Sequence, residues 1–220
     1  MIRNNGFSQD SEDVRSDRLE LMSQNIDSLA PVIGLSGTNL DWARNSSTNW
    51  AEVRATCSAS LGQLDEAYQE YHKKFDVAVE KYSQNKRLLL AIIEDIEKND
   101  KIINEYNIVG PVPHSRAGLS AAIDDWKRTH DRLRSIGDER VIPDHLVTEM
   151  VTLKNEYTAL WSNAIRLKDI SIKATSNKSR TYDRDSDKLR LVYNYSIVSL
   201  GKDSSELRLL GFVPSSEIWT

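Results

Sequence analysis

Apolar residues recur along the chain with the spacing of long amphipathic helices. The clearest run alternates steps of three and four residues, as a heptad seam does, and comprises Leu61, Leu64, Tyr68, Tyr71, Phe75, Ala78 and Tyr82. The same count extends back to Cys57 and Trp50 and forward to Asn85, Leu89, Ile92, Ile96 and Ile103. Between Gly37 and Gly110 the only glycine or proline is Gly62. The spacing therefore predicts one long helix, or two nearly collinear ones, through most of this region.

A second strong seam follows the stop formed by the GPVP sequence at 110–113. Ser115 is a suitable N-cap for a helix that ends at Gly137 and carries Leu119, Ile123, Trp126, His130 and Leu133 on one face. Pro143 is expected near the start of a further helix, whose seam is Leu146, Met150, Leu153, Tyr157, Leu160, Ala164 and Leu167. We expect a break or kink in the polar stretch 175–188, another helix over about 187–200, and a last turn at 204–210.

The beginning of the chain has a weaker pattern. Residues 1–12 are polar and are expected to form a flexible N-terminus. An imperfect amphipathic segment follows, is expected to stop near Pro31 and Gly34, and contains Val14, Arg18, Leu21, Ile26 and Leu29. With only nine Gly and five Pro in 220 residues, the pattern predicts an all-α fold. We expect an elongated bundle of long heptad-patterned helices with short accessory helices.

The two halves of the chain share a layout. The sequence IVGPVP at 108–113 is echoed by LLGFVP at 209–214, and we expect helical units at 13–113 and 114–214 with a C-terminal tail at 215–220. In this layout the chain resembles uncharacterised bacterial all-α proteins made of tandem helical units of about 100 residues. The resemblance rests on the Trp-bearing long helix, the helix that starts near Arg87 and Leu88, and the repeated Gly-x-Val-Pro ending. It implies the helical architecture and attaches no activity to any residue.

Charge and composition exclude several classes of protein. The formal net charge of −4 gives no general attraction to a phosphate backbone, so no nucleic-acid partner is expected. The single cysteine, Cys57, excludes an intramolecular disulfide framework. The longest apolar run, at 88–93, is far shorter than the roughly 20 residues that span a bilayer. The N-terminus has no apolar segment of the secretory type, so a cytoplasmic location is expected.

No pattern of catalytic or metal-ligating residues stands out. None of the four histidines follows a glutamate by three residues, which excludes the usual di-iron helical bundle. The carboxylates of Glu94, Asp95 and Glu97 are interpreted as a solvated helix face, and seam positions favour buried roles for His130 and Cys57. We therefore predict no enzyme activity, no cofactor and no metal site.

Large aromatic residues on the seam are the best candidates for a binding role. Tyr68, Tyr71, Phe75 and Tyr82 are bulky and mostly carry a hydroxyl, which suits packing between unlike helices or a wet interface with a partner. Trp219 is either folded back onto the bundle or part of an exposed docking peptide. The sequence favours a non-enzymatic interaction or scaffolding protein that binds protein partners or itself. The alternative is a membrane-surface binder or pore-forming helical protein, with 88–93 as its insertion segment.

Overall fold

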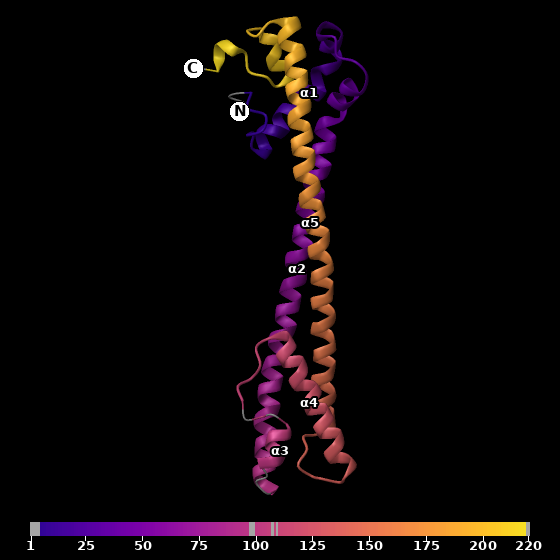
Figure 1. The fold of residues 1–220 in the computed structure, drawn as a ribbon, viewed down its shortest axis with the longest axis vertical. Coiled ribbons are helices and arrows are strands. Elements are labelled where there is room, and N and C mark those ends of the chain that lie inside the picture. Colours follow the sequence, from indigo (N-terminus) through magenta and orange to yellow (C-terminus); the bar gives the residue numbers. More distant parts are fainter. Residues whose placement is uncertain (1–4, 97–99, 107, 109, 219–220) are drawn as a thin grey trace. The chain divides into compact units, whose positions relative to one another are not determined.

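The computed structural model describes residues 5–96, 100–106, 108 and 110–218, with side chains omitted at 94–96 and 100. The chain is all-α, as predicted, with 83% helix and no strand in the part described. Its elements are α1 Glu12–Ile33, α2 Gly37–Ile96, α3 Asp100–Glu105, α4 Arg116–Ser135, α5 Asp144–Leu200, and the 3₁₀ helices η1 Ser205–Leu210 and η2 Ser215–Glu217 (Figure 1). The long helices α2 and α5 pack against each other, and the shorter helices pack as accessories.

Both long helices are continuous. The glycine at position 62 lies within α2, and the break expected at 175–188 is wrong, because α5 runs through it. Thr181, Asp185 and Ser186 in this stretch are buried, and the last two bond to groups outside α5. Polar side chains can therefore lie on the buried face of a regular helix when hydrogen bonds satisfy them.

The chain forms two compact units. Unit 1 comprises Met1–Leu61 and Ile170–Thr220, and unit 2 comprises Gly62–Asp169. Each unit therefore takes one part of α2 and one part of α5, so that it draws on both of the tandem halves expected at 13–113 and 114–214. The duplication of those halves stays a prediction.

The order of elements nevertheless repeats along the chain. A helix of about twenty residues, a very long helix and a short one occur as α1, α2 and α3, and then as α4, α5 and η1. The buried positions of the two long helices also match at a constant offset: Ala43, Ser46, Trp50 and Cys57 on α2 correspond to Met150, Leu153, Tyr157 and Ala164 on α5. Both long helices thus use the same register of buried positions.

Unit 1 has an apolar core with two arginines inside it. Its α1 is capped by Ser11, whose side chain accepts from the amide of Val14, and it ends at Gly34 in the left-handed conformation. Pro31 lies inside the last turn of the helix, which ends near Pro31 and Gly34 as predicted. The buried apolar residues include Phe7, Leu19, Met22, Ile26, Trp50, Leu189, Val192, Leu207 and Phe212.

The core of unit 2 is formed by α3, α4 and the adjoining parts of α2 and α5. The predicted α4 face is buried as expected, and Ser115 caps the helix by accepting from the amide of Gly118 at 3.1 Å. On α2 the predicted seam is buried at Tyr71, Phe75, Ala78, Tyr82, Asn85 and Leu89. The seam is wrong at Leu61, which is 48% exposed while Ser60 is buried, and at Ile92, which is less buried than Ile93. Its extensions to Trp50, Cys57 and Ile103 are buried as predicted. A helix of 3.6 residues per turn drifts away from a strict heptad count over this length.

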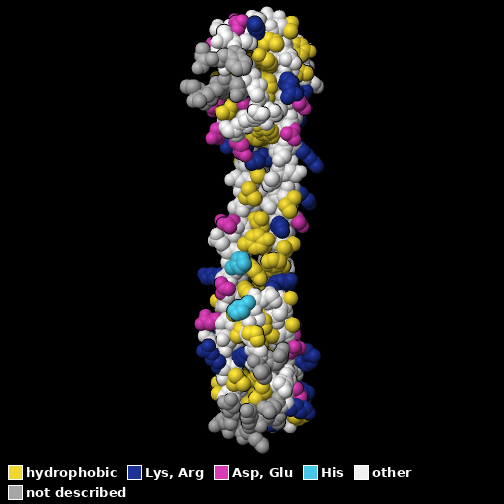
Figure 2. Space-filling view, turned by 60° about the vertical axis from the view of Figure 1, so that its left-hand side comes forward, with side chains coloured by type: hydrophobic (Ala, Val, Ile, Leu, Met, Phe, Trp, Pro, Cys, Tyr) yellow, Lys and Arg dark blue, Asp and Glu magenta, His cyan; other side chains and the backbone are white. Residues whose placement is uncertain are grey.

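The described surface mixes charges of both signs. On the face shown in Figure 2, basic and acidic side chains are interspersed, in line with the small net charge of the sequence. Among the described residues, no helix combines the length and the apolar character that a bilayer span needs.

Candidate docking pocket

Most of the aromatic residues that the sequence singled out are covered by the chain itself. Tyr71 stacks on Phe75 with ring centroids 5.7 Å apart, Phe75 meets Tyr157 edge-on at 5.4 Å, and Tyr82 lies 4.5 Å from Trp126. Each of these three seam residues is at most 8% exposed, so they form the core of unit 2. Tyr68 is partly exposed beside Trp161, and Trp219 lies outside the described residues.

The residues weighed for chemistry occupy structural positions. His130 is buried, and its Nε2 lies 3.0 Å from the carboxylate of Asp144, whose pKa is lowered by Arg134 and by this contact. Cys57 is 2% exposed and its Sγ lies 3.7 Å from the Thr175 hydroxyl. No group of three metal-ligating side chains occurs in the described part of the chain. The side chains of the carboxylate cluster at 94–97 lie outside it.

A feature that the sequence analysis did not foresee joins the two ends of unit 1. The guanidinium of Arg18, on α1, is fully buried and donates from Nε and an amino group to the two oxygens of Asp10, at 3.0 and 3.2 Å. Its other amino group donates to the carbonyl of Gly211. The Asn5 side chain bonds to both backbone groups of Val213, at 2.8 and 3.0 Å. These contacts hold the segment after η1 against the N-terminal part of the chain.

A second buried arginine completes this arrangement. Arg15 lies one turn before Arg18 and donates to the carbonyls of Phe7 and Tyr182 and to the Ser186 hydroxyl. Its guanidinium lies 3.9 Å from the centre of the Tyr182 ring, within cation–π distance. Asn5, Phe7 and Asp10 bond to these arginines, so part of the stretch 1–12, which was expected to be flexible, is held against α1.

Gly211 allows the closest approach between the chain segments of this region. Gly34, with a φ of +71, ends α1 in open space. Gly211, with a φ of +75, also contacts α1. A Cβ built on Gly211 would lie 2.9 Å from the backbone of Arg18. Only glycine fits both this conformation and this contact. The segment that follows η1 can therefore lie directly against α1.

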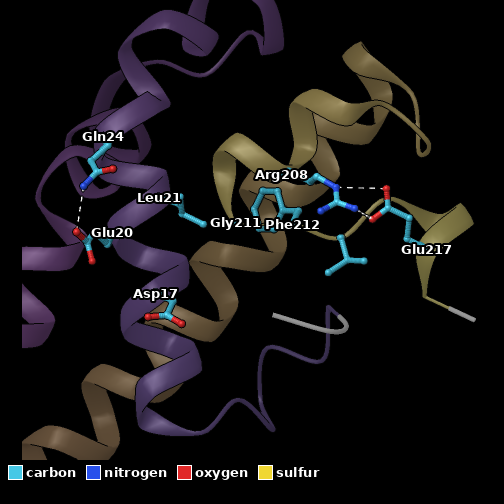
Figure 3. Close-up of a pocket in the computed structure, with 9 residues that line it drawn as sticks. Asp17, Glu20, Leu21, Gln24, Arg208, Gly211, Phe212 and Glu217 are labelled. Carbon is cyan, nitrogen blue, oxygen red and sulfur yellow. Dashed lines mark hydrogen bonds and ion pairs between the residues drawn. The ribbon is translucent and has the colours of Figure 1, made fainter. Parts of the chain in front are cut away.

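The same contact builds one wall of a pocket of about 490 Å³ in unit 1. One side is formed by α1, with Asp17, Glu20, Leu21 and Gln24, and the other by residues at and after η1, with Arg208, Gly211, Phe212, Val213 and Glu217 (Figure 3). The floor is apolar, since it is lined by Phe212 and Val213, which are almost fully buried, and by Leu21, whose side chain points toward Phe212 (Figure 3). The pocket is large enough for one or two apolar side chains.

The rim of the pocket carries mostly negative charge. Asp17 and Glu20 are exposed on α1, and Gln24 donates to the Glu20 carboxylate at 3.0 Å. Across the pocket, Arg208 forms an ion pair with Glu217. Among the described residues that line the pocket, three are carboxylates and one is a guanidinium, so the rim around the apolar floor is negative overall. The arrangement favours a ligand that is apolar at its tip and positively charged beside it.

Two signals in the sequence point to this region. The glycine after a short helical turn at 204–210 was identified as a stop, and the structure confirms a left-handed cap there. Arg15 and Arg18 stand one helical turn apart on a face that is otherwise apolar, which is the spacing of buried side chains on one helix. Some partners of these arginines, such as Tyr182 and Gly211, are more than 160 residues away and could not be read from the sequence.

Comparison with known proteins identifies no relative for this chain. No family model, no curated protein and no solved structure matches it.

Proposed function

We propose that the chain is a non-enzymatic interaction protein, and that the pocket between α1 and residues 208–217 is where it docks a protein partner. The partner is a polypeptide that inserts an apolar side chain onto Phe212 and Leu21 and places lysine or arginine next to it. The protein then acts as a scaffold, because its packed helical units present the pocket without needing to form it on binding.

The observation that supports this proposal is the combination of an apolar floor with a rim of carboxylates. Leu21 is the partly exposed apolar side chain of this concave site, and it would release water on contact with an apolar ligand. The carboxylates of Asp17 and Glu20 attract cationic neighbours of that ligand and repel anionic ones. The contacts of Arg18 and Gly211 fix the two walls and reduce the entropy lost when a ligand binds.

The test uses two capped peptides of equal length. In one, a leucine and a phenylalanine are flanked by arginines, and in the other the flanking residues are glutamates. Titration is followed in the amide NMR spectrum of the intact protein. We expect the arginine peptide to shift the amide signals of Leu21, Gly211 and Phe212, with at least about tenfold weaker binding of the glutamate peptide.

Variants separate the pocket from the rest of the surface. Glu20→Lys reverses one rim charge, and Leu21→Ser removes part of the floor, so each should weaken binding of the arginine peptide. Leu209→Ser is the matched control, since Leu209 is 46% exposed and does not line the pocket. If neither peptide shifts these signals, or if all three variants bind alike, the docking function is rejected.

A further inference from the structure

In unit 2, α4 contacts α5 in a regular order. Toward the N-terminus of α4, Asp124 pairs with Lys154, then the Ser120 and Tyr157 hydroxyls meet at 2.8 Å, and then Arg116 lies over the Trp161 ring at 5.4 Å. As the residue number falls along α4, that of its contact on α5 rises, as expected of two antiparallel helices. This order shows which part of α5 would be covered if a helix continued the line of α4.

No helix in the described part of unit 2 takes that position. Helix α4 begins at its N-cap Ser115, while α5 and α2 continue past this level. Here Tyr68 and Trp161 are only partly buried, with their rings 6.2 Å apart, and Ile165 is 37% exposed. We call these three residues the aromatic shelf.

The end of α4 that borders the aromatic shelf is positively charged. Arg116 makes its cation–π contact with Trp161 but no ion pair with any described carboxylate. The first turn of α4 contains no acidic residue, so its helix dipole is not balanced by a nearby side-chain carboxylate. A cation without a carboxylate partner beside a partly exposed tryptophan is typical of residues that dominate binding interfaces.

We propose that the aromatic shelf binds a helix of a partner protein, and that this helix continues the line of α4. Its apolar face covers Tyr68, Trp161 and Ile165. Its C-terminal end faces the start of α4, because this orientation brings its negative dipole end and a glutamate or aspartate of its last turn to Arg116. The opposite orientation would place two positive helix ends together. This surface belongs to unit 2 and does not depend on the function proposed for unit 1.

The test uses two helical peptides of about 18 residues, because shorter isolated helices are marginal in water. Both carry leucines on one face, and they differ only in the last turn, where one has two glutamates and the other two lysines. Calorimetric titration with the whole protein measures both affinities. We expect the glutamate peptide to bind about tenfold more tightly than the lysine peptide.

Substitutions on the shelf locate the binding site. Ile165→Ser should weaken the glutamate peptide about tenfold, and Arg116→Gln should remove most of the difference between the two peptides. Ile136→Ser is the matched control, since Ile136 is 66% exposed in the same unit but lies at the other end of α4. Unchanged circular dichroism of the variants shows that folding is retained, because all the substituted side chains are at least partly exposed.

Two outcomes overturn the proposal. Equal binding of the two peptides, or equal effects of Ile165→Ser and Ile136→Ser, would show that the shelf is not a specific helix site. The second outcome concerns the oligomeric state of the free protein, which analytical ultracentrifugation measures. If the free protein is a dimer that Ile165→Ser converts to a monomer, the shelf is covered by another copy of the chain and not by a separate partner.

Discussion

Asp10 and Arg18 form a two-pronged ion pair inside unit 1, in which each carboxylate oxygen accepts from a different nitrogen of the guanidinium. The arginine side chain is fully excluded from solvent and that of the aspartate is 3% exposed. Asp10 also lies 3.9 Å from Nε of Arg15, so its carboxylate is the ion-pair partner of two buried guanidinium groups, and a lone charge in a core is very costly. The pair therefore makes the packing of residues 5–10 against α1 a condition for the folding of the unit.

Removal of one member of this pair should destabilise the protein strongly. We expect Asp10→Ala to lower the free energy of unfolding by about 3–5 kcal/mol, because it leaves the buried guanidinium without its carboxylate. The control is Asp27→Ala, which breaks the exposed pair between Asp27 and Arg44, and should cost less than about 1 kcal/mol. Urea denaturation of the two variants measures both values. Similar losses would mean that the buried pair contributes no more than a surface one.

The glycine at position 211 should not tolerate a side chain. Gly211→Ala combines an unfavourable positive φ with a clash against the backbone of Arg18. Gly201→Ala has a positive φ of +89 but open space around the added methyl group, so it reports the cost of the conformation alone. We expect about 1–3 kcal/mol for Gly201→Ala and a clearly larger loss for Gly211→Ala. Thermal unfolding of both variants compares them, and equal melting temperatures would argue against the close contact.

A buried carboxylate in unit 1 should make stability depend on pH. Asp185 is 1% exposed, accepts from the indole N–H of Trp42 at 3.0 Å, and has a pKa raised above its ordinary value, mainly by burial. Since the folded state holds this proton more tightly than the unfolded state, its contribution is full below about pH 4 and is lost as the pH rises through the folded pKa.

The variant Asp185→Asn isolates this effect. The carboxylates of Glu12 and Asp138 have lowered pKa values because Lys178 and Arg140 bond to them, so they stabilise the protein in the opposite direction as the pH rises. Both groups are present in the variant and in the natural chain, so their contributions cancel in the difference between the two stabilities. We expect the stability of Asp185→Asn relative to the natural chain to increase between about pH 4 and pH 7. A constant difference across this range would contradict a raised pKa for Asp185.

The aromatic seam of α2 is expected to matter for folding more than for binding. Phe75 is 8% exposed between Tyr71 and Tyr157, so Phe75→Ala should cost about 3–5 kcal/mol by leaving a cavity. Val77→Ala, at a 40% exposed position two residues later, should cost less than about 1 kcal/mol. Chemical denaturation compares the two. Full stability of Phe75→Ala would mean that the seam is not part of the core.

The periodicity of the sequence was sufficient to place the helices that pack by apolar stripes. The faces of α4 and of the middle of α2 follow from leucine, isoleucine and aromatic spacing alone, because burial of such residues determines the orientation of a helix. The seam failed at Leu61, which is 48% exposed while the small neighbouring residue Ser60 is buried.

Polar residues account for the remaining errors. The stretch 175–188 looked like a break because serine and aspartate usually lie in solvent, yet Asp185 and Ser186 are buried by partners on other segments. The pocket between α1 and residues 208–217 was not predicted for the same reason. Its walls depend on Arg18 reaching Asp10 and Gly211, and no local pattern reveals which distant groups a buried arginine binds.

The division of the chain into units has a consequence for its synthesis. Unit 2 is one uninterrupted segment, whereas unit 1 needs residues from both ends, such as Arg18 and Gly211, which are 193 positions apart. A ribosome that adds about 5–20 residues per second takes about 10–40 s to cover that distance. Unit 2 can fold once residue 169 has been made, while the apolar face of α1 still lacks its final neighbours. In a newly made chain, α1 is therefore a segment that needs protection from aggregation until synthesis is nearly complete.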